Sequence, residues 1–386
     1  MPPIARWSLL TKASWSSRSS HCVSTTKSGL IVVYGGELKP RTPVDAAASP
    51  QDGVLKGSVH VYDLQGSLTS IHPDATAYRT WKTLAPNLAQ DAFLQIPEPR
   101  VGASTVIDGE SIYLWGGRGG VDMAPLDNAQ AGVWRGTLDI PSGVTWERIA
   151  AVNEEEVPET RSFHASAILE DKIYIHAGCP ASGRLSSLHA FDIASRKWLA
   201  LASAPEPVRG GTVLAATSLP SAGPVLVRYG GFSGYELPSE PGTIDVYSIS
   251  NDRWHTTQPA PDPMHGFPGA RSVHGFVPFR SRKAFATDAV ALLFHGEKDA
   301  SNLGHAGAGT FWNDVWLLSK NPEAGITGGW AWNKIENPSS GPVPEGRGWL
   351  PGAVWDDAAG DSHVVMHGGL LTSNERSDEL WELQID

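Results

Sequence analysis

The chain contains only two cysteines, Cys22 and Cys179, among its 386 residues, and they do not form a C-x-x-C pair. This scarcity excludes a disulfide-stapled scaffold and a cysteine-based zinc module. No apolar run reaches the ~18 residues that suggest a membrane span, and the N-terminus lacks the apolar core of a secretory signal peptide. Together these absences predict a cytoplasmic protein that does not enter a membrane.

Positive charge is also in the minority. Lys and Arg number 30 against 41 Asp and Glu, which gives a net charge of -11. Nucleic-acid phosphates are bound by Lys and Arg patches, so no nucleic-acid partner is expected. The chain also lacks a G-x-S-x-G elbow, a P-loop and a G-x-G-x-x-G motif after a strand. The absence of these motifs argues against a serine hydrolase with a nucleophile elbow and against a nucleotide-binding enzyme.

Glycine, proline and tryptophan are abundant, with 41, 29 and 15 residues, and this composition favours many short strands joined by turns. An apolar run of strand length that ends in small residues occurs six times. Each run is followed by a variable loop and then by a second strand with an aromatic residue. The six runs are LIVVYGG (30–36), SIYLWGG (111–117), KIYIHAG (172–178), VLVRYGG (225–231), ALLFHGE (291–297) and HVVMHGG (363–369).

Five of the six units continue to a tryptophan, whereas the sixth ends before it. The segment Arg6-Trp7-Ser8-Leu9 supplies the missing piece, so the N-terminal strand is expected to complete the last unit and close a ring. The pattern predicts an all-β fold, a single six-bladed β-propeller over residues 1–386. The glycine pairs, spaced aromatics and outer tryptophans resemble the kelch repeat family. The predicted blades cover approximately residues 16–85, 98–150, 159–203, 207–258, 269–336, and 345–386 together with 4–10.

One arginine begins a short strand before each glycine-containing strand. The predicted strand directions place these arginines on the same face as the loops after the glycines, at the mouth of the axial channel. Because guanidinium groups bind carboxylate, sulfate or phosphate, the ring predicts a site for an anionic ligand. The alternative is that each arginine binds carbonyls or acids of a neighbouring blade. The six are Arg18, Arg100, Arg161, Arg209, Arg271 and Arg347.

Four tryptophans lie outside the outer tryptophan position of the repeat. Trp115, Trp312 and Trp349, together with Trp15, are predicted to line the channel mouth, where flat side chains suit an apolar or aromatic ligand. Packing between blades is the alternative role for each of them.

The loop of the fifth repeat, HGEKDASNLGHAGAGTFWNDVWLL, departs from the other copies. Glu297 replaces the second glycine, and Asp299, Ser301 and His305 follow. Glutamate, aspartate and histidine are ligands of Fe(II), Mn(II) or Zn(II), so Glu297, Asp299 and His305 are candidate metal ligands. His295 is expected to point elsewhere. A network of hydrogen bonds that stabilises the loop is the alternative.

This loop and the count of six blades resemble the plant specifier proteins of glucosinolate breakdown, which form nitriles, epithionitriles and thiocyanates. The resemblance implies action on unstable aglucones with ferrous iron as cofactor. The iron motif of that family is Glu, then Asp four residues on, then His four further. Glu297 and His305 match its ends, whereas Ser301 stands at the Asp position. The stretch AGAGTFWNDV also resembles the family, which supports common ancestry more than common chemistry.

Three functional classes are compatible with these residues. The favoured one is a small-molecule pocket at the upper channel mouth that acts on or directs a reactive molecule, anionic or aromatic. It would act in a specifier-like way, with Fe(II) or another divalent metal, or as a metal-free catalyst of natural-product cyclisation. The alternative is a scaffold for protein–protein interaction without catalysis. The third class is a protein that binds a metal or an anion without turnover.

Overall fold

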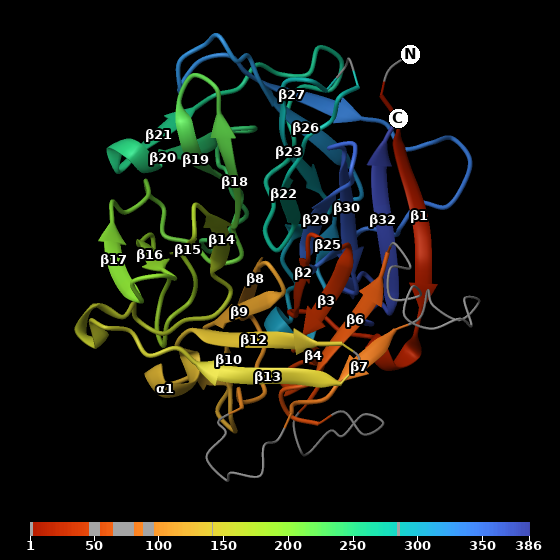
Figure 1. The fold of residues 1–386 in the computed structure, drawn as a ribbon. Helices are drawn as coiled ribbons and strands as arrows, with labels where there is room; N and C mark the ends of the chain where they lie inside the picture. Colours follow the sequence, from red (N-terminus) through yellow and green to blue (C-terminus); the bar gives the residue numbers. More distant parts are fainter. Residues whose placement is uncertain (1–2, 46–54, 65–80, 88–95, 141, 284–285) are drawn as a thin grey trace.

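The computed structural model describes residues 3–45, 55–64, 81–87, 96–140, 142–283 and 286–386 (Figure 1). Parts of the predicted blades one, two and five lie outside the described residues. Within the described residues, no helix is long and apolar enough to cross a membrane.

Six antiparallel sheets of four strands surround a central axis, which confirms the predicted all-β, six-bladed propeller (Figure 1). The innermost strands of neighbouring blades contact one another around the axis, in the order β2, β8, β14, β18, β22, β29 and back to β2. The repeat in the sequence therefore corresponds to the blade in the structure, as expected for a radial repeat.

Each blade runs from an inner to an outer strand. Blade one consists of β2 (Cys22–Thr25), β3 (Leu30–Tyr34), β6 (Val59–Asp63) and β7 (Lys82–Leu84). Blade two consists of β8 (Ser104–Asp108), β9 (Ser111–Trp115), β12 (Trp134–Asp139) and β13 (Gly143–Arg148). Blade three consists of β14 (Ala165–Leu169), β15 (Lys172–His176), β16 (Leu188–Asp192) and β17 (Lys197–Leu201). Blade four consists of β18 (Val213–Leu219), β19 (Gly223–Tyr229), β20 (Ile244–Ser248) and β21 (Arg253–Thr257). Blade five consists of β22 (Gly275–Pro278), β23 (Ala289–Phe294), β26 (Val315–Lys320) and β27 (Trp330–Ile335). Blade six consists of β29 (Gly352–Asp356), β30 (Ser362–His367), β32 (Glu379–Ile385) and β1 (Ala5–Lys12).

The N-terminal strand closes the ring as predicted. β1 pairs antiparallel with β32, from Ala5 opposite Ile385 to Lys12 opposite Glu379. Trp7 is 4% exposed and packs edge-on against Trp381 of its own blade and Phe294 of blade five. The closing strand therefore buries its tryptophan at the junction with the fifth blade.

Short hairpins and one helical turn stand on the face where the second strand of each blade ends. They are β4 (Glu37–Lys39) with β5 (Thr42–Pro43), β10 (Arg118–Gly119) with β11 (Ala124–Pro125), β24 (Glu297–Asp299) with β25 (Thr310–Phe311), β28 (Arg347–Gly348) with β31 (Leu370–Leu371), and α1 (Asn128–Ala131). The core is divided into clusters of apolar side chains that join neighbouring blades, so the blades support one another as a rigid base for these loops.

Candidate functional site

The six repeat arginines have a structural role, which corrects the prediction that they face a ligand. Each is at most 5% exposed. Each donates from Nη1 to a backbone carbonyl at the end of the glycine-containing strand of its own blade, at 2.9–3.2 Å. A buried guanidinium must satisfy its donors, and here backbone carbonyls satisfy them. None of the six lines the cavity described below. These carbonyls belong to the blade of the arginine itself, so the stated alternative, a contact with a neighbouring blade, is not what these bonds show. This applies to Arg18, Arg100, Arg161, Arg209, Arg271 and Arg347.

A closed ring of backbone hydrogen bonds lies beside these arginines. The residue two positions after each arginine has φ between 45° and 63°, in the left-handed region. Its N–H donates to the carbonyl of the equivalent residue in the preceding blade at 2.7–2.9 Å, and the last bond runs from Ser20 back to Trp349. We call these six the floor residues: Ser20, Gly102, Phe163, Gly211, Val273 and Trp349.

Two aromatic floor residues meet over the axis. Phe163 belongs to blade three and Trp349 to blade six, which are opposite each other in a ring of six. Their rings pack edge-to-face with centroids 5.3 Å apart. Gly102 makes room for this arrangement, because a Cβ there would lie 2.7 Å from the Phe163 ring. The aromatic pair thus provides an apolar bar across the upper end of the channel.

A second set of equivalent residues stands above the floor. The residue that follows the second glycine of each pair forms a bridge with the residue after the repeat arginine of the same blade. We call these the wall residues: Glu37, Arg118, Cys179, Phe232, Glu297 and Leu370. Glu297 does not replace a glycine, which corrects the alignment of the fifth repeat. Gly296 has the φ of the second glycine, 105°, and His295 occupies the first position with φ 53°.

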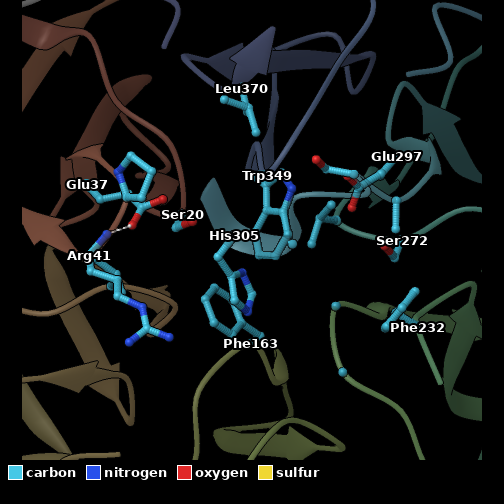
Figure 2. Close-up of a pocket in the computed structure, with 18 of the residues that line it drawn as sticks. Ser20, Glu37, Arg41, Phe163, Phe232, Ser272, Glu297, His305, Trp349 and Leu370 are labelled. Carbon is cyan, nitrogen blue, oxygen red and sulfur yellow. Dashed lines mark hydrogen bonds between the residues drawn. The ribbon is translucent and has the colours of Figure 1, made fainter. Parts of the chain in front are cut away.

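All floor and wall residues except Gly102 and Cys179 line a cavity of about 270 Å³ at the mouth of the axial channel (Figure 2). Loop residues complete its lining. Among the described residues, its charged side chains are four arginines and two glutamates, so this lining is locally basic in a protein of net charge -11. The arginines are Arg41, Arg118, Arg184 and Arg376, and the glutamates are Glu37 and Glu297.

One side of the cavity carries three arginines that are not neutralised. Glu37 pairs with Arg376 at 3.2 Å, whereas Arg41, Arg118 and Arg184 form no salt bridge with the residues that the structure describes. Arg118 Nε donates to Ser162 Oγ at 2.7 Å, which leaves its other donors free for a ligand. Burial and then the nearby charge of Arg41 lower the pKa of the Arg118 guanidinium. An anion placed here would relieve the repulsion between these groups.

Aromatic faces hold two of these arginines. The Arg118 guanidinium carbon lies 5.4 Å from the centre of the Phe163 ring, and that of Arg184 lies 4.9 Å from the Phe232 ring. Stacking on an aromatic face restricts an arginine side chain and leaves the edge of its guanidinium available for hydrogen bonds. The cations are therefore oriented before a ligand arrives.

The other side of the cavity is acidic. Glu297 is 6% exposed, and burial raises its pKa to about 7, while a hydrogen bond from Trp349 opposes the shift. Both carboxylate oxygens of the nearby Glu236 are buried, and a hydrogen bond with Ser272 favours the charged form of this carboxylate. Burial, together with the charges of Glu297 and Asp299, raises the pKa of Glu236 to about 8.

The three candidate metal ligands are not brought together as one donor set. Glu297 and His305 line the cavity, and the His305 ring lies 5.9 Å from that of Trp349. A register shift in β24 separates Glu297 from Asp299, whose carboxylate accepts a hydrogen bond from Thr310 on the exposed side of the hairpin. Within the described ranges, no three His, Cys, Asp or Glu side chains are grouped so that they could hold a metal ion. The residues present therefore do not fit the iron set that the resemblance implies.

One of the predicted tryptophans lines the cavity. Trp349 is the floor residue of blade six. Trp115 is 2% exposed and packs against Trp198 and His164 inside blades two and three. The Trp312 indole donates to the Ala270 carbonyl at 3.0 Å and lies beneath Arg271 and Lys298. Trp115 and Trp312 therefore pack between structural elements and do not face a ligand, in line with the packing role stated as their alternative. Trp15 packs against His60 and Trp81 of the first blade.

Several cavity residues were not identified from the sequence, although a signal for some of them exists. The wall residue always follows the second glycine, and the floor residue always stands two positions after the repeat arginine. Reading these two columns across the six repeats would have found Arg118, Phe163 and Phe232. Arg41, Arg184 and Arg376 lie at no equivalent positions of their loops, so no repeat pattern marks them.

Comparison with known proteins agrees with this architecture. The family model described as KLHDC2/KLHL20/DRC7 Kelch-repeats domain matches residues 70–287, more than half of the chain. The chain belongs to the kelch-repeat family. The solved structure of YjhT superposes on this kelch protein with a TM-score of 0.61, covers 96% of this chain and 97% of its own, and is 12% identical, so this likeness concerns the fold alone.

Two relatives illustrate the range of kelch proteins that resemble this one. A Thlaspi arvense protein named N-(sulfonatooxy)prop-2-enimidothioate sulfolyase is 25% identical over 379 residues, which cover 94% of this chain and 91% of that protein. Kelch domain-containing protein 3 of Bos taurus is 24% identical over 263 residues, 65% of this chain and 58% of the relative. The first similarity supports the resemblance to the plant specifier proteins across most of this kelch chain.

Proposed function

We propose that this kelch protein binds a small anionic organic molecule in the cavity and acts on it in a specifier-like way. The observation that carries the proposal is that Arg41, Arg118 and Arg184 converge on one cavity of an otherwise acidic protein and pair with no acid among the described residues. The name of the Thlaspi relative describes a lyase for a molecule that bears a sulfonatooxy group. A sulfate monoester or a free sulfonate carries the negative charge that these arginines would recognise.

The chain supplies three contributions to such a reaction. The arginines hold the anionic group and stabilise negative charge that leaves with it. Phe163 and Trp349 exclude water from the floor of the cavity, and the ring of backbone bonds fixes their positions. A reactive intermediate held in one geometry is thereby directed to one product. This proposal requires no strong acid or base from the protein.

Calorimetric titration with alkanesulfonates tests the binding step. We expect saturable binding to the wild type and a loss of affinity of roughly ten-fold or more in Arg118→Ala with Arg184→Ala, because a hydrogen bond to a charged group contributes about 1.5–3 kcal/mol. The matched control is Arg253→Ala with Lys197→Ala, which removes two exposed charges from outer strands. Equal affinity in the two double variants would contradict an arginine-based site.

Product analysis tests the catalytic step. Glucosinolate breakdown mixtures with wild-type protein are expected to differ in product ratio from mixtures with the Arg118→Ala, Arg184→Ala variant. Identical ratios with the two proteins, and with no protein, would remove specifier-like action and leave a binding protein.

A scaffold role is a second candidate, favoured by the rim of the same face. Three loops that follow wall residues each expose a large apolar side chain: Val121 is 102% exposed, Leu303 74% and Tyr235 53%. Exposed apolar groups near a concave site are typical of protein contacts. Affinity capture that yields the same partners from the wild type and from Val121→Ser, Leu303→Ser, Tyr235→Ser would exclude this rim as the contact surface.

A further inference from the structure

The cavity has two chemically different ends. Arg118 is the wall residue of blade two and Glu297 that of blade five. These blades are separated by two blades on either side, so the two residues face each other across the axis. Figure 2 shows the same division, with Arg41 and Glu37 on one side, Glu297 and Ser272 on the other, and Phe163, His305 and Trp349 between them. The aromatic bar thus lies between a basic and an acidic end.

The acidic end has acceptors that the protein leaves largely unused. Glu297 is 6% exposed, yet it lines the cavity, and Trp349 is the side-chain donor to its carboxylate among the described residues. The nearby Glu236 does not line the cavity, and among the described residues Ser272 is the side chain within hydrogen-bonding reach of its buried carboxylate. Buried acceptors without donors cost free energy, and a ligand that brings donors to them removes this cost.

The loop around Glu297 is built to hold the carboxylate at this position. A Cβ at Gly309 would lie 2.5 Å from Glu297 Oε1 and 2.1 Å from the Asp299 carbonyl oxygen, so only glycine lets β25 pass so close. The backbone of Glu297 is fixed on both sides by its bridge to Ser272, with N–H···O distances of 2.9 and 3.2 Å. The fold therefore fixes the backbone that carries this carboxylate.

We propose that the ligand carries, at the end opposite its anionic group, a hydrogen-bond-donating nitrogen, best a protonated amine, which Glu297 binds. Its apolar middle rests on Phe163 and Trp349. This inference rests on the proposed function for the anionic end and adds the chemistry of the other end. Glu297 serves as a specificity-determining residue, because a ligand without the donor leaves its acceptors unpaired.

The test uses two matched series of probes at neutral pH. The first series is ω-aminoalkanesulfonates of increasing chain length, beginning with taurine, and the second is the alkanesulfonates of the same lengths. At the best length, we expect the wild type to bind the amino compound about ten-fold or more tightly than its partner. Glu297→Gln keeps the shape of the side chain and should remove most of this preference without weakening the binding of the plain sulfonate.

Arg118→Ala separates the two proposals, since it should weaken both series alike. If neither series binds to the wild type, the proposed function fails. If both series bind equally well at every length, or if Glu297→Gln keeps the full preference for the amine, only the assignment of the donor end is overturned. The preference for amino compounds is measured on the wild type alone, so the comparison of the two series still tests the proposal if Glu297→Gln does not fold.

Discussion

At the scale of single residues, arginines of this protein perform two unrelated tasks, and their surroundings decide which. The repeat arginines are enclosed by carbonyls that take up their donors, as Arg271 shows with the carbonyls of Gly269 and His295. Arg118 instead stands on the wall with most of its donors free. A guanidinium is a ligand group only where the fold leaves its donors unsatisfied.

Arg271→Ala should therefore destabilise the fold and leave ligand affinity unchanged in the folded fraction. The Arg271 guanidinium is buried and makes two bonds to the Asp314 carboxylate, at 2.7 and 3.1 Å. Removal of one partner of a buried pair costs about 3–5 kcal/mol, because the other charge stays buried. Urea unfolding measures this change.

Arg118→Ala serves as the comparison in the same experiment. It should alter the free energy of unfolding by less than about 1 kcal/mol and weaken sulfonate binding. The division into structural and ligand-binding arginines would be wrong if Arg271→Ala unfolded at the same urea concentration as the wild type.

Gly102→Ala tests the fit of the aromatic bar. Gly102 has φ 62°, and a Cβ there would lie 2.7 Å from the Phe163 ring, whereas Gly109 has φ 59° and open space around it. Alanine in the left-handed region costs about 1–2 kcal/mol at either position. The clash should add about 1–3 kcal/mol at position 102 only, so Gly102→Ala should unfold at clearly lower urea than Gly109→Ala. Equal stability of the two variants would show that Phe163 moves aside freely.

At the scale of elements, β1 pairs with the C-terminal strand β32 and so joins the two ends of the chain. The buried side chain of Trp7 contributes much of the packing at this junction. Trp7 is 4% exposed, contacts Phe294 and Trp381, and donates from Nε1 to Asn337 Oδ1 at 3.0 Å. The closing strand thus contacts the blade that precedes its own, and this contact removes the open edge that a six-blade ring would otherwise have.

Trp7→Ala should lower the free energy of unfolding by about 3–5 kcal/mol, the range for buried large aromatics. Leu9→Ala on the same strand is the control, because Leu9 is 39% exposed and should cost much less. Thermal unfolding of both variants measures the difference. A Trp7→Ala protein as stable as Leu9→Ala would mean that the ring is held closed by the β1–β32 backbone pairing alone.

At the scale of the whole molecule, buried histidines make the propeller sensitive to acid. Burial lowers the pKa of His164 and His295 to about 3 and lowers the pKa values of four others, His21, His176, His274 and His367. An unfolded histidine has a pKa near 6.5. Below pH ~6.5 the unfolded chain therefore binds more protons, and the stability contributed by neutral burial is lost as the pH falls toward ~3.

We expect the free energy of unfolding to be clearly lower at pH 5 than at pH 7. His164 and His295, with pKa values of about 3, each cost about 2 kcal/mol at pH 5, and the other four act in the same direction. Glu236, Glu297, Asp45 and His363 act in the opposite direction, because their raised pKa values favour the folded state at lower pH. The six buried histidines outnumber these four groups, so the net effect is a loss. Urea unfolding at the two pH values measures it.

His274→Leu is the matched variant for this experiment. Both ring nitrogens of His274 are buried without a hydrogen-bond partner among the described residues, so leucine removes a titrating group and no bond. The difference in stability between pH 7 and pH 5 should be smaller in this variant than in the wild type, because one of the buried histidines no longer titrates on unfolding. A difference as large as that of the wild type would show that His274 does not titrate on unfolding.

The fold was predictable because its determinants are local and repeated. Six strands that end in small residues, with aromatics at fixed positions, define six equivalent units, and the missing tryptophan of the sixth unit identifies Trp7 as its replacement. The site was predictable only in its location. The face of the channel mouth follows from strand direction, and Glu297, His305 and Trp349 do line the cavity there. The six repeat arginines do not line it, and Glu297, Asp299 and His305 do not come together as one set of metal ligands.

The sequence by itself determined the propeller, the number of its blades, its closure by the N-terminal strand and the face that carries the loops. Each of these depends on periodic patterns within a repeat. Only the tertiary structure decided which side chains face the cavity, because that depends on the left-handed turn after each arginine and on bonds between blades. Trp349 and Phe163 are far apart in the chain and meet over the axis. Arg271 and Arg118 carry the same group, and their packing alone makes one a structural residue and the other a candidate ligand contact.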